Sequence, residues 1–240
     1  MNSIPIIGIL SIILQSPNVN SCPEIEDAFE PLAKVQVVKL CRSEYELAYS
    51  TERKITVWAA ERLTSVEAND TEPRENQFVA DDELSRGKRA ELYDYTNSGY
   101  DRGHIVPAGD MHTLKGMLES FYLSNMMPQV PGNNRGIWKS LEKYAKDTAK
   151  LRKDVLIITG PIISKTTLTI GPNRIPVPRA MFKIIYDLNT HESWSFLIPN
   201  EKLQASALPN YLKKKKDIEK ETGLTFPFQS NEQDKMLSND

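Results

Sequence analysis

The sequence predicts an α+β protein with a mixed or antiparallel sheet at its core and helices at its flanks. Segments rich in β-branched and aromatic residues come in pairs joined by short polar turns, as at 45–49 with 55–63 and at 181–186 with 194–198. Three other stretches have the character of helices. At 240 residues and 40% apolar composition, one domain with a sizeable core is expected, with two small domains as the alternative.

The amino-terminal part of the chain begins the sheet. Strands are expected at 35–40, 45–49 and 55–63, and the polar residues 50–53 form the turn between the last two. From 64 to 98 the chain is polar and charged, with little periodicity. A stretch of this length is either a disordered loop or a functional one.

The central and carboxy-terminal parts alternate between helices and strands. A short helix is expected at 114–123, and Asn133 or Asn134 caps a longer one whose apolar residues recur at helical spacing. The later elements are a strand at 155–159 closed by Gly160-Pro161, strands at 181–186 and 194–198, a helix at 210–222 ended by Gly223, and a frayed polar tail at 229–240.

The first 21 residues carry no charged side chain and contain an apolar run at 4–14. This run is too short to span a bilayer, which needs about 20 residues, but it fits the core of a secretory signal peptide. A buried amino-terminal strand or helix is the alternative. Export favours a disulfide between Cys22 and Cys41, worth about 3 kcal/mol by chain entropy. A lipidated Cys22 is the other interpretation.

The net charge and the absence of certain motifs limit the classes of function that the sequence predicts. The chain has 30 basic and 32 acidic residues, a net charge of −2, so composition alone does not predict nucleic-acid binding. The sequence contains no CxxC or HExxH zinc motif, no GxSxG nucleophile elbow and no phosphate-binding GxxxxGK[ST] loop.

The stretch 100–111, YDRGHIVPAGDM, contains a histidine, an arginine and an aspartate close together, which are side chains suited to catalysis or phosphate binding. His104 is expected at the end of a strand, since Ile105-Val106 are β-branched and 107–109 end the run, and its imidazole can accept a proton near neutral pH. Arg102 suits a phosphate, because its planar fork of donors matches phosphate oxygens. A surface pair of Asp101 with Arg102 beside a packed histidine is the alternative.

The residues that follow make a longer pattern. After DRGH come Asn125, Pro128-Gln129, and then Asn134, Gly136, Trp138, Leu141 and Glu142. This ordered set resembles the DNA/RNA non-specific endonucleases of the ββα-metal superfamily. Further likenesses are RENQF at 74–78, DYTNSGY at 94–100, VLIITGPI at 155–162 and IEKETGLTF at 218–226, so the resemblance covers roughly 22–228. The expected organisation is a signal peptide at 1–21, a nuclease domain with a ββα-metal motif at 22–228 and a tail at 229–240.

The resemblance implies a role for each matching residue. His104 is expected to be the general base that deprotonates the attacking water. Arg74 contacts the scissile phosphate, unless it is only a solvated loop arginine. Asn134 is the sole direct protein ligand of the metal, and Glu142 holds the metal-bound waters. Asn125 either fixes its loop or assists the histidine.

Helix geometry agrees with this division of labour. In a straight α-helix Asn134 and Glu142 lie about 80° apart around the axis and about 12 Å along it, too far to share one ion directly. Mg²⁺ suits such a site because it retains most of its waters, with Mn²⁺ as a substitute. Asp101 is expected to orient the site by hydrogen bonds. Where one kind of relative has a second arginine this chain has Lys146, so a phosphate role there is in doubt.

The expected activity is metal-dependent, sugar-non-specific cleavage of DNA and RNA, read through backbone phosphates. Activity should fall with salt and at acid pH as His104 is protonated. The alternatives are a phosphodiesterase for another substrate and an inactive nucleic-acid-binding relative. A secreted or periplasmic protein without a stable membrane span is expected, and a homodimer is compatible with the sequence.

Overall fold

The computed structural model describes residue 25, residues 29–164 and residues 167–237. The expected signal peptide and Cys22 lie outside these residues. Within them an eight-stranded sheet organises the chain, in the order β1-β2-β3-β6-β9-β10-β11, with β12 also paired to β10. The strands are β1 (Val38–Cys41), β2 (Glu46–Ser50), β3 (Ile55–Thr64), β6 (Asp154–Ile162), β9 (Ala180–Asp187), β10 (Glu192–Pro199), β11 (Leu212–Lys213) and β12 (Asn231–Glu232).

The pairing confirms the expected α+β class with a mixed or antiparallel sheet. Every neighbouring pair on the main path is antiparallel, and β10 with β12 is parallel. Two small ribbons stand apart from the sheet: β4 (Asp101–His104) with β5 (Met126–Gln129), and β7 (Thr169–Ile170) with β8 (Ile175–Pro176).

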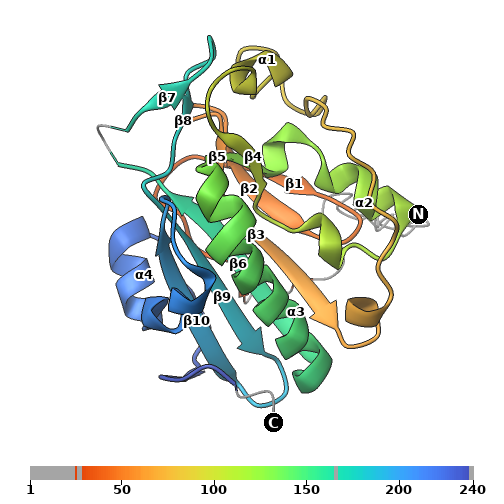
Figure 1. The fold of residues 1–240 in the computed structure, drawn as a ribbon, viewed down its shortest axis with the longest axis vertical. Helices are drawn as coiled ribbons and strands as arrows, with labels where there is room; N and C mark the ends of the chain where they lie inside the picture. The colour runs from red at the N-terminus through yellow and green to blue at the C-terminus, as the bar shows by residue number, and fades with distance from the viewer. Residues whose placement is uncertain (1–24, 26–28, 165–166, 238–240) are drawn as a thin grey trace, which may run out of the picture.

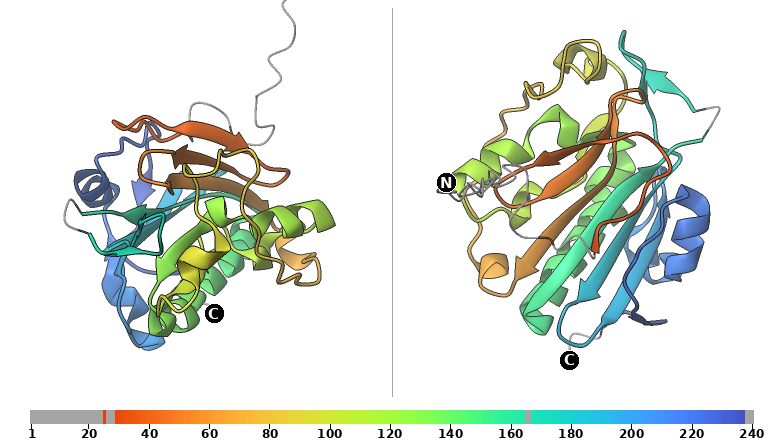
Figure 2. Two further views of the ribbon diagram at one scale, coloured as in Figure 1. Left: turned by 90° about the horizontal axis from the view of Figure 1, so that it is seen from above. Right: turned by 180° about the vertical axis from the view of Figure 1, so that it is seen from behind.

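Helices cover both faces of the sheet. The helices are α1 (Leu92–Tyr95), α2 (Leu114–Ser120), α3 (Lys139–Arg152) and α4 (Lys215–Thr222), with a π-helical turn η5 (Asn133–Trp138) leading into α3 and short 3₁₀ turns η2 (Glu67–Asn69), η3 (Ala108–Asp110), η4 (Leu123–Asn125) and η6 (Ala205–Tyr211). Figure 1 shows α3 lying along the front of the sheet, and in the view from behind the strands lie in front of it (Figure 2, right).

Alternation along the strands builds two cores. Successive side chains of a strand point to opposite faces, so Ile157 packs in the core under α3 while Ile158 packs in the core on the other face. The α3 side holds Trp138 and Leu141, and the opposite core holds Ile218 of α4. The catalytic candidates all belong to the α3 side.

Two expected boundaries are wrong, each because of tertiary pairing. Strand β6 continues through Gly160-Pro161, since β3 pairs with β6 only as far as Thr159 and leaves the proline one neighbouring strand, β9. The expected helix at 210–222 begins only at Lys215, because Leu212–Lys213 pairs with β10. Gly223 does end it, in the left-handed conformation that favours glycine.

The tail is not frayed over its described residues. Asn231–Glu232 pairs with β10, and the Trp194 indole donates a hydrogen bond to the Lys235 carbonyl at 3.1 Å. The start of the long helix also differs from expectation, because neither Asn133 nor Asn134 caps it. Their side chains bind other parts of the chain, which removes them from capping.

Candidate active site

The ribbon β4–β5 places the DRGH residues beside the long helix. Strand β4 ends at His104, as expected, and β5 lies antiparallel to it. A Cβ on Gly103 would come within 2.0 Å of the Gln129 side chain. The glycine of the motif is therefore needed for close packing, and Gln129 in turn donates to the Asn133 amide oxygen at 2.8 Å. This contact connects β5 to the start of the helical segment.

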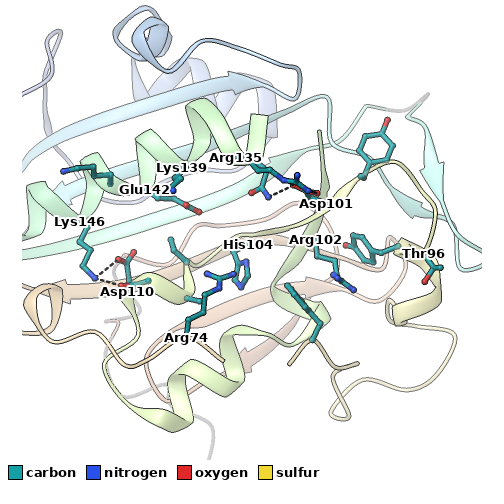
Figure 3. Close-up of a pocket in the computed structure, with 18 residues that line it drawn as sticks. Arg74, Thr96, Asp101, Arg102, His104, Asp110, Arg135, Lys139, Glu142 and Lys146 are labelled. Carbon is teal, nitrogen blue, oxygen red and sulfur yellow. Dashed lines mark hydrogen bonds and ion pairs between the residues drawn. The ribbon is translucent and has the colours of Figure 1, made fainter. Parts of the chain in front are cut away.

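A cavity of about 900 Å³ opens between β4 and the helix. Figure 3 shows His104, Arg74 and Arg102 on one side of it and Glu142, Lys139 and Arg135 on the other. Its charged lining consists of six cations and three carboxylates: Arg74, Arg102, Arg135, Lys139, Lys143, Lys146, Asp101, Asp110 and Glu142. The cavity is therefore locally basic although the chain has a net charge of −2.

His104 is a buried histidine in an aromatic setting. Its ring meets Phe121 edge-on at 5.0 Å and Phe78 at 5.8 Å, and its Nε2 has no hydrogen-bond partner among the described residues. Burial, followed by the positive charge of Arg74, lowers the pKa of His104 to about 3. The imidazole is thus neutral near pH 7, and a loss of activity through its protonation is expected only at strongly acid pH.

Two arginines stack on the same aromatic pair. The Arg74 guanidinium lies 5.1 Å from the Phe121 ring centre, and that of Arg102 lies 4.2 Å from the Phe78 ring centre. Cation–π stacking orients a guanidinium while leaving its edge donors available. Arg74 is exposed, and its Nε donates a hydrogen bond to the amide oxygen of Asn76. Neither arginine forms an ion pair among the described residues, so both keep donors for an anion.

Asn134 is held by Asp101. Its Nδ2 donates to Asp101 Oδ2 at 2.9 Å, and Arg135 binds the same carboxylate through Nε at 2.9 Å and Nη2 at 2.6 Å. The two donors hold the pKa of Asp101 below its ordinary value, although burial alone would raise it. With its nitrogen engaged, the amide of Asn134 has its oxygen left as an acceptor in the cavity.

Glu142 lines the same cavity from α3, half-buried. Burial raises the pKa of Glu142 to about 7, while the positive charges of Lys183 and Arg74 lower it and Asp110 raises it. The straight-helix argument for its distance from Asn134 does not hold. The π-helical turn and the non-helical Gly136 (φ −112°, ψ −109°) lie between them.

This donor set fits a hard divalent cation. Asn134 offers an amide oxygen and Glu142 a carboxylate, the oxygen ligands that Mg²⁺ prefers. Among the described residues no group of three or more His, Cys, Asp or Glu side chains is arranged to hold a metal. An ion here would retain most of its waters, which Mg²⁺ does readily.

Lys146 is engaged by other groups of the protein at the rim of the cavity. Its Nζ donates to Thr71 Oγ1 at 2.6 Å and to the Gly109 carbonyl, and it lies 3.8 Å from Asp110 Oδ1. These contacts join α3 to two loops at the rim of the cavity. They occupy donors of the Lys146 ammonium that a phosphate would otherwise use.

Asn125 does not line the cavity. The side chain is fully buried; its oxygen accepts from Val106 N at 3.0 Å, and its Nδ2 donates to the Val106 and Ser120 carbonyls at 2.9 Å. These hydrogen bonds join the segment that follows His104 to the end of α2 through the Asn125 side chain.

Sequence reasoning missed several residues of this region. The rings of Phe78 and Phe121 contact His104, and each stacks against one of the two arginines. Lys139 lines the cavity as an exposed cation. Phe78 ends the RENQF motif, and Asp110 lies within the stretch first singled out. Lys183 had a clearer signal, since it interrupts an apolar strand.

Comparison with known proteins agrees with this geometry. The profile of the DNA/RNA non-specific endonuclease family matches residues 28–234. The chain belongs to this family. It is therefore a metal-dependent nuclease of the hydrolytic, endonucleolytic kind, with the ββα-metal fold.

Individual relatives show how much is shared. Nuclease C1 of Cunninghamella echinulata var. echinulata is 34% identical over 203 residues, 77% of this chain and 81% of the relative. The mitochondrial endonuclease G of Homo sapiens is 32% identical over 201 residues, 77% of this chain and 68% of the relative. The crystal structure of the EndoG/EndoGI complex contains a chain with a TM-score of 0.73 and 28% identity, covering 83% of this chain and 89% of that one.

No helix in the described part of the chain has the length and apolar character needed to cross a membrane.

Proposed function

We propose that this chain cleaves DNA and RNA at internal phosphodiester bonds with Mg²⁺ as the cation, Mn²⁺ substituting. The observation that carries the proposal is the juxtaposition in one basic cavity of neutral His104 with Asn134, Glu142 and two stacked arginines. The cation would supply charge neutralisation at the phosphoryl and leaving oxygens.

His104 would act as the general base. Its imidazole is neutral and lines the cavity, so a ring nitrogen can accept the proton of an attacking water. The aromatic contacts fix the ring plane, which avoids reorganisation when the proton moves. The water's oxygen would then bond to phosphorus as the P–O bond to the leaving sugar oxygen breaks.

Asn134 would ligate the cation through its amide oxygen, and Glu142 would accept hydrogen bonds from the cation's waters. Arg74 would bind the scissile phosphate through its free guanidinium edge, with Arg102 and Lys139 meeting neighbouring phosphates. Backbone contacts of this kind carry no base information. The same groups therefore accept either sugar.

The deciding experiment measures nicking of supercoiled plasmid and degradation of RNA with Mg²⁺, with EDTA, and by the His104→Ala variant. Loss of both activities in both controls is expected. Activity that survives His104→Ala would overturn the general-base role. Failure of the intact chain to cut either polymer with Mg²⁺ or Mn²⁺ would redirect the search to smaller phosphodiesters or to binding alone.

We further propose that the chain is exported, with cleavage after Ser21 and a Cys22–Cys41 disulfide. The support is the uncharged, apolar character of the first 21 residues and the even pair of cysteines. Mass spectrometry of the secreted product without reduction tests both, and an acylated Cys22 would contradict the disulfide. The homodimer stays a prediction, which sedimentation equilibrium distinguishes from a monomer.

A further inference from the structure

Arg74 reaches the rim of the cavity on a stretch of irregular backbone. Residues 70–78, named here the strap, belong to no helix or strand, and most of their side chains are exposed. Backbone of this kind, with few packed side chains, opens locally at a low cost in free energy. The place of Arg74, proposed above to bind the scissile phosphate, therefore depends on how the strap is anchored.

The strap is anchored by its backbone at two points. Beyond its carboxyl end, Val79 N donates to the Phe121 carbonyl at 3.3 Å, and the Val79 carbonyl accepts from Leu123 N at 2.8 Å. Near its amino end, Glu72 N donates to the Met111 carbonyl at 2.9 Å. Between these two points the strap forms no backbone–backbone hydrogen bond with the rest of the described chain.

Lys146 of α3 adds a side-chain anchor at the amino end. Its Nζ donates to Thr71 Oγ1 at 2.6 Å and to the Gly109 carbonyl, and it lies 3.8 Å from Asp110 Oδ1. Thr71 Oγ1 in turn donates to the same Gly109 carbonyl at 3.3 Å. Figure 3 shows the lysine reaching from the helix toward Asp110. One ammonium thus joins three parts of the site: the helix α3, the turn η3 and the strap.

The anchor is strong because of its charge and its base. Hydrogen bonds from an ammonium are roughly twice as strong as neutral ones, and the Lys146 side chain is only 19% exposed. The helix that carries it is fixed by Leu141, Ala145 and Ala149, which are buried in the core. A group held by a packed helix is placed more precisely than one held by a loop.

Thr71 is close enough to Arg74 for this anchor to place the arginine. Three residues of extended chain span about 11 Å at most, so fixing Thr71 limits where Arg74 can lie. The Arg74 guanidinium lies 5.1 Å from the centre of the Phe121 ring, a contact that needs the strap held against the cavity. Its other contact, from Nε to Asn76, lies within the strap itself and does not fix the arginine to the rest of the site.

We propose that Lys146 is a positioning residue of the active site, which anchors the strap to α3 and η3 and so holds Arg74 at the cavity for the scissile phosphate. The inference rests on the phosphate-binding role proposed above for Arg74. The alternative is a direct contact of the Lys146 ammonium with a phosphate. The two differ in what they require of Thr71, an uncharged residue that an anchor needs and a charge-based phosphate contact does not.

The first measurement is hydrogen–deuterium exchange of the Glu72 amide, which reports whether the amino end of the strap is held. The variants are Lys146→Met and Thr71→Val. In Lys146→Met exchange should be about tenfold faster or more, because a hydrogen bond to a charged group usually contributes at least that factor. Thr71→Val should change exchange in the same direction. The control, Lys150→Met, replaces an exposed lysine one turn further along α3 and should change exchange by less than about twofold.

The second measurement is plasmid cleavage in a double-mutant cycle with Arg74→Ala. In the unsubstituted chain, Lys146→Met should lower kcat/KM about tenfold or more, since misplacing a substrate-positioning group by about 1 Å can cost as much as 10²-fold. In the Arg74→Ala background the same substitution should lower it by less than about threefold, because the residue that it positions is gone. Thr71→Val should follow the same pattern, and Thr71→Ser, which keeps the hydroxyl, should restore both exchange and cleavage.

Unchanged exchange of the Glu72 amide in Lys146→Met and Thr71→Val would overturn the proposal, because the strap would then be held without the lysine. Equal losses of cleavage from Lys146→Met with and without Arg74 would also overturn it, since a direct phosphate contact behaves in that way. Failure of the proposed function is a separate result. In a chain that cuts no nucleic acid the exchange measurement still decides whether Lys146 holds the strap, and an active nuclease can show unchanged exchange.

Discussion

Asp101 accepts a hydrogen bond from Asn134 at 2.9 Å, so the strand that contains His104, the proposed general base, also holds the proposed metal ligand. The contact engages the amide nitrogen and leaves the oxygen for the cation. Arg135 binds the same carboxylate from the solvent side and completes its hydrogen bonding. This one carboxylate couples the two halves of the site.

Asp101→Ala is expected to raise the Mg²⁺ requirement of cleavage about tenfold or more, because loss of a partner that orients a metal ligand typically costs that much. The control is Arg135→Ala, which removes the exposed ion pair but keeps the Asn134 contact. An exposed pair contributes little, so the control should change the requirement by less than about threefold. The Mg²⁺ requirement is measured by titrating activity against Mg²⁺. Equal effects of both variants would contradict the role of Asp101 in orienting Asn134.

His104→Ala is expected to lower the turnover number by about 10²–10⁴, the usual contribution of a general base. Substrate binding should persist, because Arg74 and Arg102, the arginines proposed to bind phosphate, stack on Phe121 and Phe78 rather than on the imidazole. His191→Asn is the control, since His191 contacts Tyr186 and does not line the cavity. Single-turnover cleavage measures the rate of the chemical step, and a separate assay measures DNA binding. A loss of binding in His104→Ala would contradict the prediction.

Activity at sub-saturating Mg²⁺ should be about tenfold lower at pH 6 than at pH 8. The pKa of Glu142 is raised to about 7, so its carboxylate is mostly protonated at the lower pH and mostly ionised at the higher one. His104, with a pKa of about 3, is neutral at both. The Glu142→Gln variant should have low activity that does not fall further between pH 8 and pH 6. If its activity still falls over this range, the pH dependence belongs to another group.

Lys139→Ala should weaken binding of DNA and RNA alike and reduce the salt slope of log K by about one, because each neutralised phosphate contributes about 0.9. Lys150→Ala is a matched control, the same residue type on the same helix but outside the cavity lining. Fluorescence anisotropy over a salt series measures both slopes. A loss confined to one base sequence or one sugar would contradict backbone recognition.

Asn125→Ala should destabilise the fold by about 2–4 kcal/mol, because it leaves buried groups of Val106 and Ser120 without their partners. The exposed Asn189→Ala should cost less than about 0.5 kcal/mol. Urea unfolding gives both values. Activity per folded molecule should fall far less than in His104→Ala. A comparable fall would indicate that Asn125 takes part in the reaction.

Much of the fold and site follows from local sequence. Runs rich in β-branched and aromatic residues located the major strands, and DRGH with the later Asn, Trp and Glu located the cavity. What failed was decided by distant neighbours. Leu212–Lys213 is extended because β10 offers a free edge, and Asn133 caps nothing because its amide donates to the Pro199 and Glu201 carbonyls. Local patterns contain no record of such partners.

By itself the sequence determined the family and the residue types of the reaction: an imidazole, an amide, a carboxylate and arginines in a recognisable order. Only the tertiary structure decided the protonation of these groups. Burial against Phe121 holds His104 neutral, and Lys183, 41 residues after Glu142, acts on that carboxylate from another strand. The physical reason is that desolvation and Coulomb interactions depend on distance in space, which spacing along the chain does not give.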